Sequence, residues 1–352
     1  MAFVRSRPLI DETALHSQNP RMISLTPSAP TLRPPSHRAA TVFTADLAGL
    51  RAQAQGLVDA AGLDPDFRVL RPRAPWSLLS PKLWPGARRV LNPTLLAPPF
   101  GDVLIGCGGA SARLLAQLRS PDRPAVIIQH PRLDPARFDL IIAAPHDRIS
   151  GANVFIARTA LHRVTPALLA AAAAQWSARF APLPRPLVSV LIGGSNGRYR
   201  LDEPTARRLA ADLAAMMRRD HVGLVLTPSR RTSPLVRAIF TETLAPLGAD
   251  IWDMQGENPY FGMLALADAI IVTADSVSMV SEAVATTAPV LLARLPGRST
   301  RIGAFMDDMV TRGRARWFAG RLESGSTDAL NDTPAAAEAL RQCLGWISDA
   351  RD

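Results

Sequence analysis

Short runs of consecutive apolar residues recur along the chain, separated mostly by segments of helical length. One series comprises residues 39–43, 67–70, 102–106, 125–129 and 140–143, and a second comprises residues 187–192, 223–227, 251–253, 269–273 and 289–292. Strands buried on both faces have this continuous apolar character, and intervening helices make successive strands parallel. The pattern therefore predicts an α/β protein with two Rossmann-like, doubly wound domains facing a cleft. We expect helices at residues 51–61, 110–119, 204–219, 234–244, 260–267, 276–286 and 333–350.

The length of 352 residues suits two domains, each with its own core. Residues 1–38 are rich in Pro, Ser and Arg and show no periodicity, which predicts a disordered leader. The Pro-rich segment 181–186 separates the two series of strands. We therefore expect an N-terminal domain at 39–184 and a C-terminal domain at 185–352, with the last helix a candidate to return to the first domain.

The net charge of +10 comes almost entirely from arginine, since Lys82 is the only lysine. Aromatic residues make up 5% of the chain, which disfavours stacking on single-stranded nucleic acid. The charge favours anionic partners instead, either phosphorylated ligands or an acidic membrane surface. The number of copies in the assembly is left open.

Two cysteines, Cys107 and Cys343, stand far apart, and no metal-ligand spacing is present. No apolar run approaches the ~20 residues of a membrane span, and no signal-peptide pattern begins the chain. These features predict a cytoplasmic protein, compatible with peripheral association with the inner membrane.

Two loops that follow strands of the second series carry residue types that bind phosphate. The first contains Gly193, Gly194, Ser195 and Asn196, whose glycines allow close backbone approach and an anion nest. The second contains Ser229, Arg230, Arg231 and Thr232 at the start of a helix. A flexible turn and a solvated basic turn are the simpler alternatives, but the position at strand ends favours ligand binding.

Further candidates follow the third and fourth strands of this series. Asn258 belongs to a turn, and the ring of Tyr260 is suited equally to stacking on a base and to packing under the loop. Beyond 269–273, the three- and four-residue spacing places Asp275, Ser278, Met279 and Glu282 on one helix face, with Asp275 or Ser276 as the cap. A carboxylate at Glu282 can accept hydrogen bonds from two ribose hydroxyls, although a surface glutamate is common.

These loops resemble two related groups of proteins. The Gly193–Ser195 loop and the helix bearing Glu282 are similar to the phosphate loop and nucleotide-binding helix of GT-B glycosyltransferases of the peptidoglycan GlcNAc-transferase type. Closer still is the resemblance to the mitochondrial-fission ELM family, carried over residues 41–317 by LIGGSNGRY (191–199), SRRT (229–232), ENPY (257–260), TADSVSMVSEA (273–283), DPARFDLIIAAPHD (134–147) and ALHRVTP (160–166).

The resemblance implies a GT-B-like fold with the nucleotide-sugar donor in the C-terminal domain and the acceptor on the N-terminal domain. It suggests a metal-independent glycosyltransferase with no separate cofactor, acting on an envelope or lipid acceptor. The alternative is a non-catalytic adaptor or scaffold at a membrane, because the family's plant member acts in mitochondrial division.

One departure concerns catalysis. The family's first loop usually reads T-D-G-x-A-G, whereas residues 44–49 here read T-A-D-L-A-G, so the acid moves one place and a glycine is lost. A sugar transferase needs a general base for the acceptor hydroxyl. The candidates after the strands of the first series are Asp46, His130 and His146, and none stands out among them.

Overall fold

The computed structural model describes residues 38–79, 83–323 and 325–346. All of the predicted leader except Arg38 lies outside the described residues, and Arg38 begins the first strand. Between residues 71 and 100, where loops with short helices are expected, the chain forms short helical turns at Trp76–Leu78, Ala87–Val90 (α2) and Pro93–Leu96.

The first sheet has six parallel strands in the order β2-β1-β3-β4-β5-β6. From β3 to β6 neighbouring strands follow one another in sequence, while β1 and β2 run in the opposite order on the other side of β3. This reversal is typical of a doubly wound sheet, and it makes the carboxyl ends of β1 and β3 a topological switch point. The strands are β1 (Arg38–Thr44), β2 (Leu63–Val69), β3 (Val103–Cys107), β4 (Ala125–Ile128), β5 (Leu140–Ala143) and β6 (Val154–Ile156).

The second sheet is also parallel, with the order β12-β11-β10-β7-β8-β9. Every residue of β7, β8, β10 and β11 is buried, as the continuous apolar runs predict. The strands are β7 (Leu187–Ile192), β8 (Gly223–Pro228), β9 (Asp250–Ile251), β10 (Ala269–Thr273), β11 (Val290–Ala293) and β12 (Ala315–Trp317).

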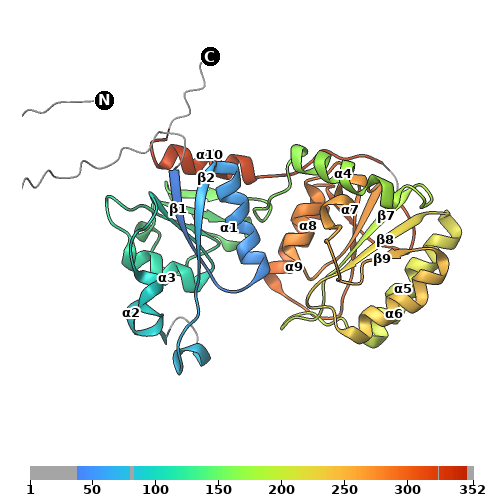
Figure 1. The fold of residues 1–352 in the computed structure, drawn as a ribbon, viewed down its shortest axis with the longest axis horizontal. Helices are drawn as coiled ribbons and strands as arrows, with labels where there is room; N and C mark the ends of the chain where they lie inside the picture. The colour runs from blue at the N-terminus through green and yellow to red at the C-terminus, as the bar shows by residue number, and fades with distance from the viewer. Residues whose placement is uncertain (1–37, 80–82, 324, 347–352) are drawn as a thin grey trace, which may run out of the picture. The chain divides into compact units, whose positions relative to one another are not determined.

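Helices cover both faces of each sheet (Figure 1). On the first sheet, α1 (Ala48–Ala61) and α10 (Thr333–Cys343) share a core on one face, and α2 and α3 (Gly109–Leu118) pack on the other. On the second sheet, α5 (Glu203–Asp220) and α6 (Pro234–Leu244) cover one face. The opposite face packs against α4 (Pro166–Phe180), α7 (Tyr260–Leu266), α8 (Val277–Val284) and α9 (Thr300–Thr311).

The last helix, α10, follows the second sheet in sequence but packs beside α1 on the first sheet (Figure 1). Its Leu340 is fully buried in the same core as Leu57 of α1. At its start, Asp332 accepts hydrogen bonds from the backbone amide and the guanidinium of Arg158. The C-terminal segment therefore joins the core of the first sheet.

Local sequence signals set the helix starts in the second half of the chain. The side-chain oxygens of Asp202, Ser233, Ser276 and Ser299 each accept the backbone amide three residues later. Such N-caps satisfy amides that have no partner within the helix. Proline at the first turn of α5 and α6 has a backbone angle that suits a helix and lacks only an amide that would be unpaired.

The predicted α/β class with two doubly wound parallel sheets is confirmed, and most element boundaries lie within a few residues of expectation. Strand β2 begins at Leu63, four residues before the predicted start, and includes Pro65. An edge strand tolerates a proline because one side of it makes no ladder hydrogen bonds, and β2 is such an edge. The short edge strands β6 and β12 and the helix α9 are not predicted, since their apolar residues are few and interrupted.

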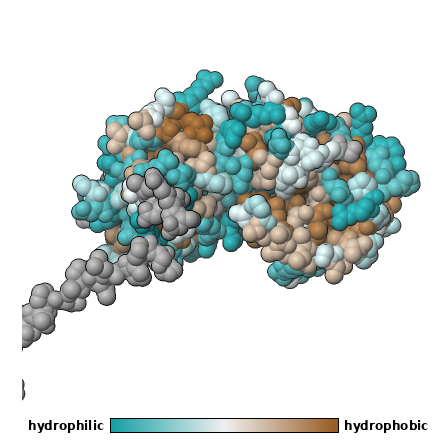
Figure 2. Space-filling model, turned by 90° about the horizontal axis from the view of Figure 1, so that it is seen from above, coloured by the Kyte–Doolittle hydropathy of each residue, from teal (hydrophilic) through white to brown (hydrophobic). Residues whose placement is uncertain are grey.

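Figure 2 shows polar and apolar residues interspersed over one face of the molecule. None of the helices in the described part of the chain is long and apolar enough to cross a membrane.

Candidate functional site

The loop after β7 is held against the loop after β10 through its first two amides. Gly193 donates its amide to Thr273 Oγ1 at 2.8 Å, and Gly194 donates to Asp275 Oδ2 at 3.2 Å. A Cβ on Gly194 would lie 2.3 Å from the carbonyl oxygen of Arg231, so only glycine fits this approach. The two amides are therefore occupied within the protein, and the expected anion nest is not formed by them.

The predicted phosphate loop after β8 clamps the same glycines. The hydroxyls of Ser229 and Thr232 donate to the Gly193 carbonyl oxygen at 2.6 and 2.5 Å. Arg231 Nη1 donates to the Gly194 carbonyl at 3.0 Å and pairs with Asp275 Oδ2 at 2.7 Å. Within the described residues the guanidinium of Arg230 makes no such contact and is exposed. Three of the four predicted ligands thus hold the loop, and Arg230 is left for solvent or a ligand.

Asp275 is the centre of this cluster. Its side chain is fully buried, Oδ2 accepts the Gly194 amide and pairs with Arg231, and Oδ1 has no hydrogen-bond partner within the described residues. A buried carboxylate is tolerated when a cation and hydrogen bonds compensate its lost hydration. Asp275, the first residue of the predicted ligand-binding face, therefore anchors the loops after β7 and β8 instead.

Ser195 and Asn196 shape the chain that leaves the loop. Ser195 Oγ accepts the amide of Leu201 at 2.9 Å, while Asn196 Oδ1 accepts the amides of Arg198 and Tyr199, each at 2.9 Å. Both polar side chains thus stabilise the turn that presents Arg198.

The remaining predicted residues of α8 pair with the start of α7. The Tyr260 hydroxyl donates to Glu282 Oε2 at 2.5 Å, and its ring lies edge-on to Phe261. Burial raises the pKa of Glu282 to about 7, and the Tyr260 hydrogen bond opposes that shift. Asn258 is exposed and accepts the Tyr260 amide at 3.0 Å. Tyr260 therefore packs under the loop and is hydrogen-bonded to Glu282, the residue predicted to bind the ribose.

The N-terminal turn of α8 lies close to the first turn of α1. Ser276 caps α8 by accepting the amide of Met279, and Ser278 and Met279 are half-buried. A Cβ on Gly49 would lie 3.2 Å from Ser278 Oγ. The loop with the altered T-A-D-L-A-G sequence thus runs into a helix that begins beside the predicted nucleotide helix.

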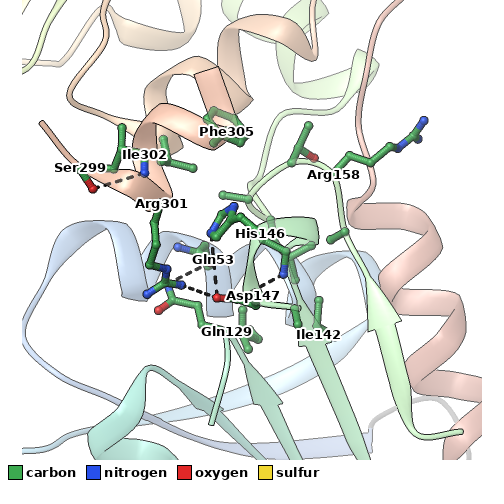
Figure 3. Close-up of a pocket in the computed structure, with 18 of the residues that line it drawn as sticks. Gln53, Gln129, Ile142, His146, Asp147, Arg158, Ser299, Arg301, Ile302 and Phe305 are labelled. Carbon is green, nitrogen blue, oxygen red and sulfur yellow. Dashed lines mark hydrogen bonds and ion pairs between the residues drawn. The ribbon is translucent and has the colours of Figure 1, made fainter. Parts of the chain in front are cut away.

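A cavity of about 680 Å³ is lined by strand ends of the first sheet and by the start of α9 (Figure 3). From the first half of the chain it is lined by Gln53 of α1, the ends of β4 and β5, His146 and Asp147 of the turn Pro145–Asp147 (η5) and residues 157–161. From the second half it is lined by Arg198, Val277 and residues 298–302 with Phe305. Of all the predicted site residues, the catalytic candidate His146 alone lines this cavity, and none of the predicted nucleotide-binding residues does.

Five arginines line the cavity. Arg158 pairs with Asp332 at 2.5 Å, and Arg301 pairs with Asp147 at 2.8 Å. The guanidinium groups of the other three, Arg132, Arg198 and Arg298, have no ion-pair partner among the described residues. Unpaired guanidinium groups are strong, bidentate binders of phosphate and carboxylate, so the cavity is suited to an anion.

Backbone pairing brings two of these arginines together. The amide of Arg298 donates to the carbonyl of Arg198 at 3.1 Å, beside a β-bridge between Tyr199 and Gly297. A Cβ on Gly297 would lie 2.1 Å from the Arg198 carbonyl oxygen, so this approach also needs glycine. The loop after β7 and the loop before α9 thus present their cations as one unit.

His146 stands beside the one carboxylate that lines the cavity. Asp147 Oδ1 lies 4.0 Å from His146 Nε2 and accepts a hydrogen bond from Arg301, and Figure 3 shows Arg301 reaching across to it. Burial lowers the pKa of His146 below its usual 6.5, Arg301 adds to this, and the charge of Asp147 opposes it. The imidazole is therefore neutral at pH 7 and able to accept a proton.

The other two catalytic candidates lie outside the cavity lining. His130 Nδ1 accepts the amide of Arg132 at 2.9 Å and so stabilises a turn. The Asp46 side chain is 70% exposed and pairs with Arg71 at 3.0 Å. Of the three, only His146 lies in a place where a ligand could be enclosed.

Sequence reasoning missed the arginines that dominate the cavity. Arg298 and Arg301 lie in the segment after β11, and Arg198 follows the glycines of a loop already singled out. Ligands bind beyond the carboxyl ends of strands, and this rule applied to the loop after residues 289–292 predicts Arg298 and Arg301.

Comparison with known proteins confirms the family resemblance predicted from the sequence. Residues 48–344 match the family described as Mitochondrial fission ELM1. The chain is 32% identical over 276 residues to the mitochondrial fission protein ELM1 of Arabidopsis thaliana, covering 69% of this chain and 65% of that protein. It is 31% identical over 163 residues to the uncharacterized protein RP120 of Rickettsia prowazekii, covering 44% of this chain and 46% of that protein.

The fold resembles that of the UDP-GlcNAc 2-epimerase of Methanocaldococcus jannaschii. The TM-score is 0.51 at 10% identity, with 86% of this chain and 99% of the epimerase covered. A second structure of that enzyme, in complex with UDP-GlcNAc and UDP, gives 0.50 at 9% identity with the same coverage. At such low identity the likeness shows the fold alone, which is GT-B-like.

The family match spans most of the chain, and the residues it covers include both sheets beyond β1, the arginine-lined cavity and α10. The chain itself spans about two thirds of the Arabidopsis protein and under half of the Rickettsia protein. On the extent of this match, the chain belongs to the mitochondrial fission ELM1 family.

Proposed function

We propose that this protein is a metal-independent glycosyltransferase that takes a sugar from a nucleotide-sugar donor. The observation that carries the proposal is a single cavity that holds a histidine with a lowered pKa and three arginines with no ion-pair partner in the described part of the chain. Cations stabilise a departing diphosphate, and a neutral histidine accepts the proton of an attacking hydroxyl. Residues 39–184 would form the acceptor side, and residues 185–352 the donor side.

The donor diphosphate is assigned to Arg198 and Arg298, whose backbones are hydrogen-bonded to each other. The N-terminus of α9 lines the same cavity, and its dipole also favours negative charge. Arg132 supplies a third cation from the first half of the chain.

The nucleoside is assigned to the half-buried side of α7 and α8. Val277 lines the cavity, and its neighbour Ser278 shares a face of the same helix with Glu282, four residues and about 6 Å further by the helical rise. That distance suits the ribose of a nucleotide whose diphosphate lies in the cavity. Glu282 would accept the ribose hydroxyls, with Ser278 and Met279 beside it, while Arg230 and Asn258 remain candidates for the outer part of the ligand.

In the transfer step, the acceptor oxygen attacks the anomeric carbon of the donor sugar. The new bond joins that oxygen to the carbon as the bond from carbon to the diphosphate oxygen breaks, and the electron pair leaves with the nucleoside diphosphate. The acceptor proton passes to the imidazole of His146. Arg301 keeps the charge of Asp147 compensated, so that the imidazole remains neutral before the step.

We assign the acceptor to envelope or lipid molecules. The net charge of +10 favours approach to an acidic membrane face, which corresponds to a cytoplasmic protein that associates peripherally with the inner membrane.

A second candidate function is a nucleotide-binding adaptor without catalysis. It is favoured by Asp46, which occupies the altered family loop yet is exposed and paired with Arg71 outside the cavity lining. This adaptor would bind the nucleotide sugar in the same way and leave it unreacted.

The first prediction concerns donor binding. We expect UDP-N-acetylglucosamine to bind, and Arg298→Gln to weaken it by about tenfold or more, as for the loss of a hydrogen bond to a charged group. Arg208→Gln, on the exposed side of α5, is the matched control and should leave the dissociation constant unchanged. Isothermal calorimetry checks both. If no UDP-, GDP-, CMP- or ADP-sugar binds, the donor site does not exist.

The second prediction uses the raised pKa of Glu282. Between 4.5 and about 7 its folded form holds a proton that the unfolded form has lost, so this group reduces the free energy of unfolding as pH rises through that range. Glu282→Gln should therefore stabilise the protein relative to the wild type more at about pH 8 than at about pH 5.

The same substitution should weaken UDP-N-acetylglucosamine at the higher pH by about 1–3 kcal/mol, because the charged acceptor for the ribose is lost. Urea denaturation and calorimetry measure the two effects. Equal stability differences at both pH values, with unchanged affinity, would show that Glu282 is an ordinary surface acid.

The third prediction concerns the pKa of His146. An NMR titration should place it below 6.5 in the wild type. Arg301→Gln removes a cation that lowers this pKa and leaves the negative charge of Asp147, which raises it, so the pKa should increase. The acidic limb of any transfer activity should move upward with it. A pKa that stays the same or falls in Arg301→Gln would rule out this electrostatic coupling.

A further inference from the structure

A second chamber of about 550 Å³ adjoins the arginine-lined cavity. The two share His146, Arg158, Thr300, Arg301 and Phe305 as common wall. The second chamber alone adds Pro145, Arg148, Ala304 and Asp308. Because His146 lines both spaces, it can face a ligand in either of them.

All but one of the charged side chains that line the second chamber are held in ion pairs. Arg158 is held by Asp332 and Arg301 by Asp147, while Asp308 pairs with Arg312 at 2.7 Å. The guanidinium of Arg148 has no ion-pair partner among the described residues. The chamber therefore carries one uncompensated positive charge.

The position of Arg148 is set by the same turn that places His146. Residues Pro145–Asp147 form η5, and Arg148 follows it with a φ of 52° in the left-handed region. The cation and the histidine are thus two residues apart on one short turn, with Pro145, Ala304 and Phe305 as apolar wall.

We propose that the second chamber is the acceptor site and that it takes an acidic acceptor, a hydroxyl compound bearing a phosphate or carboxylate that Arg148 binds. This assignment rests on the proposed transferase function. The anion fixes one end of the acceptor at Arg148, and a hydroxyl at the other end meets His146 at the common wall. The proton of that hydroxyl passes to His146 as its oxygen bonds to the donor sugar carbon and the nucleoside diphosphate departs.

The test uses the full chain saturated with UDP, so that the arginines of the first cavity are occupied. The probes are sn-glycerol 3-phosphate and D-glycerate, with glycerol as the neutral counterpart, and ligand-observed NMR gives the dissociation constants. We expect at least one anion to bind, and glycerol to bind at least about tenfold more weakly, the scale for hydrogen bonds to a charged group. The anion that binds more tightly shows whether the acidic group of the acceptor is a phosphate or a carboxylate.

The matched variants are Arg148→Gln, Arg148→Lys and Arg208→Gln. Arg148→Gln should lose about tenfold or more in affinity for the anion and keep its affinity for UDP, while the lysine variant retains part of the anion binding and the control is unaffected. Thermal melting verifies that each variant is folded.

Anion binding no tighter than that of glycerol, or an equal loss in Arg208→Gln, would overturn the acceptor assignment while UDP binding leaves the donor site standing. Failure of UDP itself to bind would overturn the proposed function and this assignment with it.

Discussion

The buried carboxylate of Asp275 is the contact on which the second sheet's strand-end loops depend. It joins the loop after β7, through Gly194, to the loop after β8, through Arg231, from its own position after β10. Because a buried charge needs compensation, losing either partner would leave it destabilising. The close approach also explains why no side chain fits on Gly193 or Gly194: a Cβ would lie 2.3 Å from Asp275 Oδ1 in the first case and 2.3 Å from the Arg231 carbonyl oxygen in the second.

Fixing these loops has a consequence further along the chain. The segment that leaves the anchored glycines turns at Asn196 and carries Arg198 to the main chain of Arg298, so two cations from distant loops meet at one cavity. Arg301, in the first turn of α9, then reaches Asp147 next to His146, which follows a strand of the first sheet. The anchored loops, the arginines of the cavity and the pKa of His146 are thus connected through a short series of contacts.

Much of the fold could be predicted because continuous apolar strands and capped helices are local signals. The edge strand β2, with Pro65, and the short β6 and β12 carry weaker signals because edge positions tolerate interruption. Within the site, residue types were recognised but not their partners. Ser229, Arg231, Thr232 and Asp275 have the chemistry of phosphate ligands and anchors alike. Only tertiary contacts show that the first three bond to the carbonyls of Gly193 and Gly194 and that Arg231 also pairs with Asp275.

In the proposed function, a nucleotide sugar places its diphosphate in the arginine-lined cavity. A crystal structure of the protein with UDP-N-acetylglucosamine tests it most directly. We expect diphosphate oxygens within hydrogen-bond distance of Arg198 and Arg298, ribose hydroxyls at Glu282, and the sugar near the imidazole of His146. A nucleotide bound elsewhere on the chain, or a cavity that stays without ligand at saturating concentration, would contradict it.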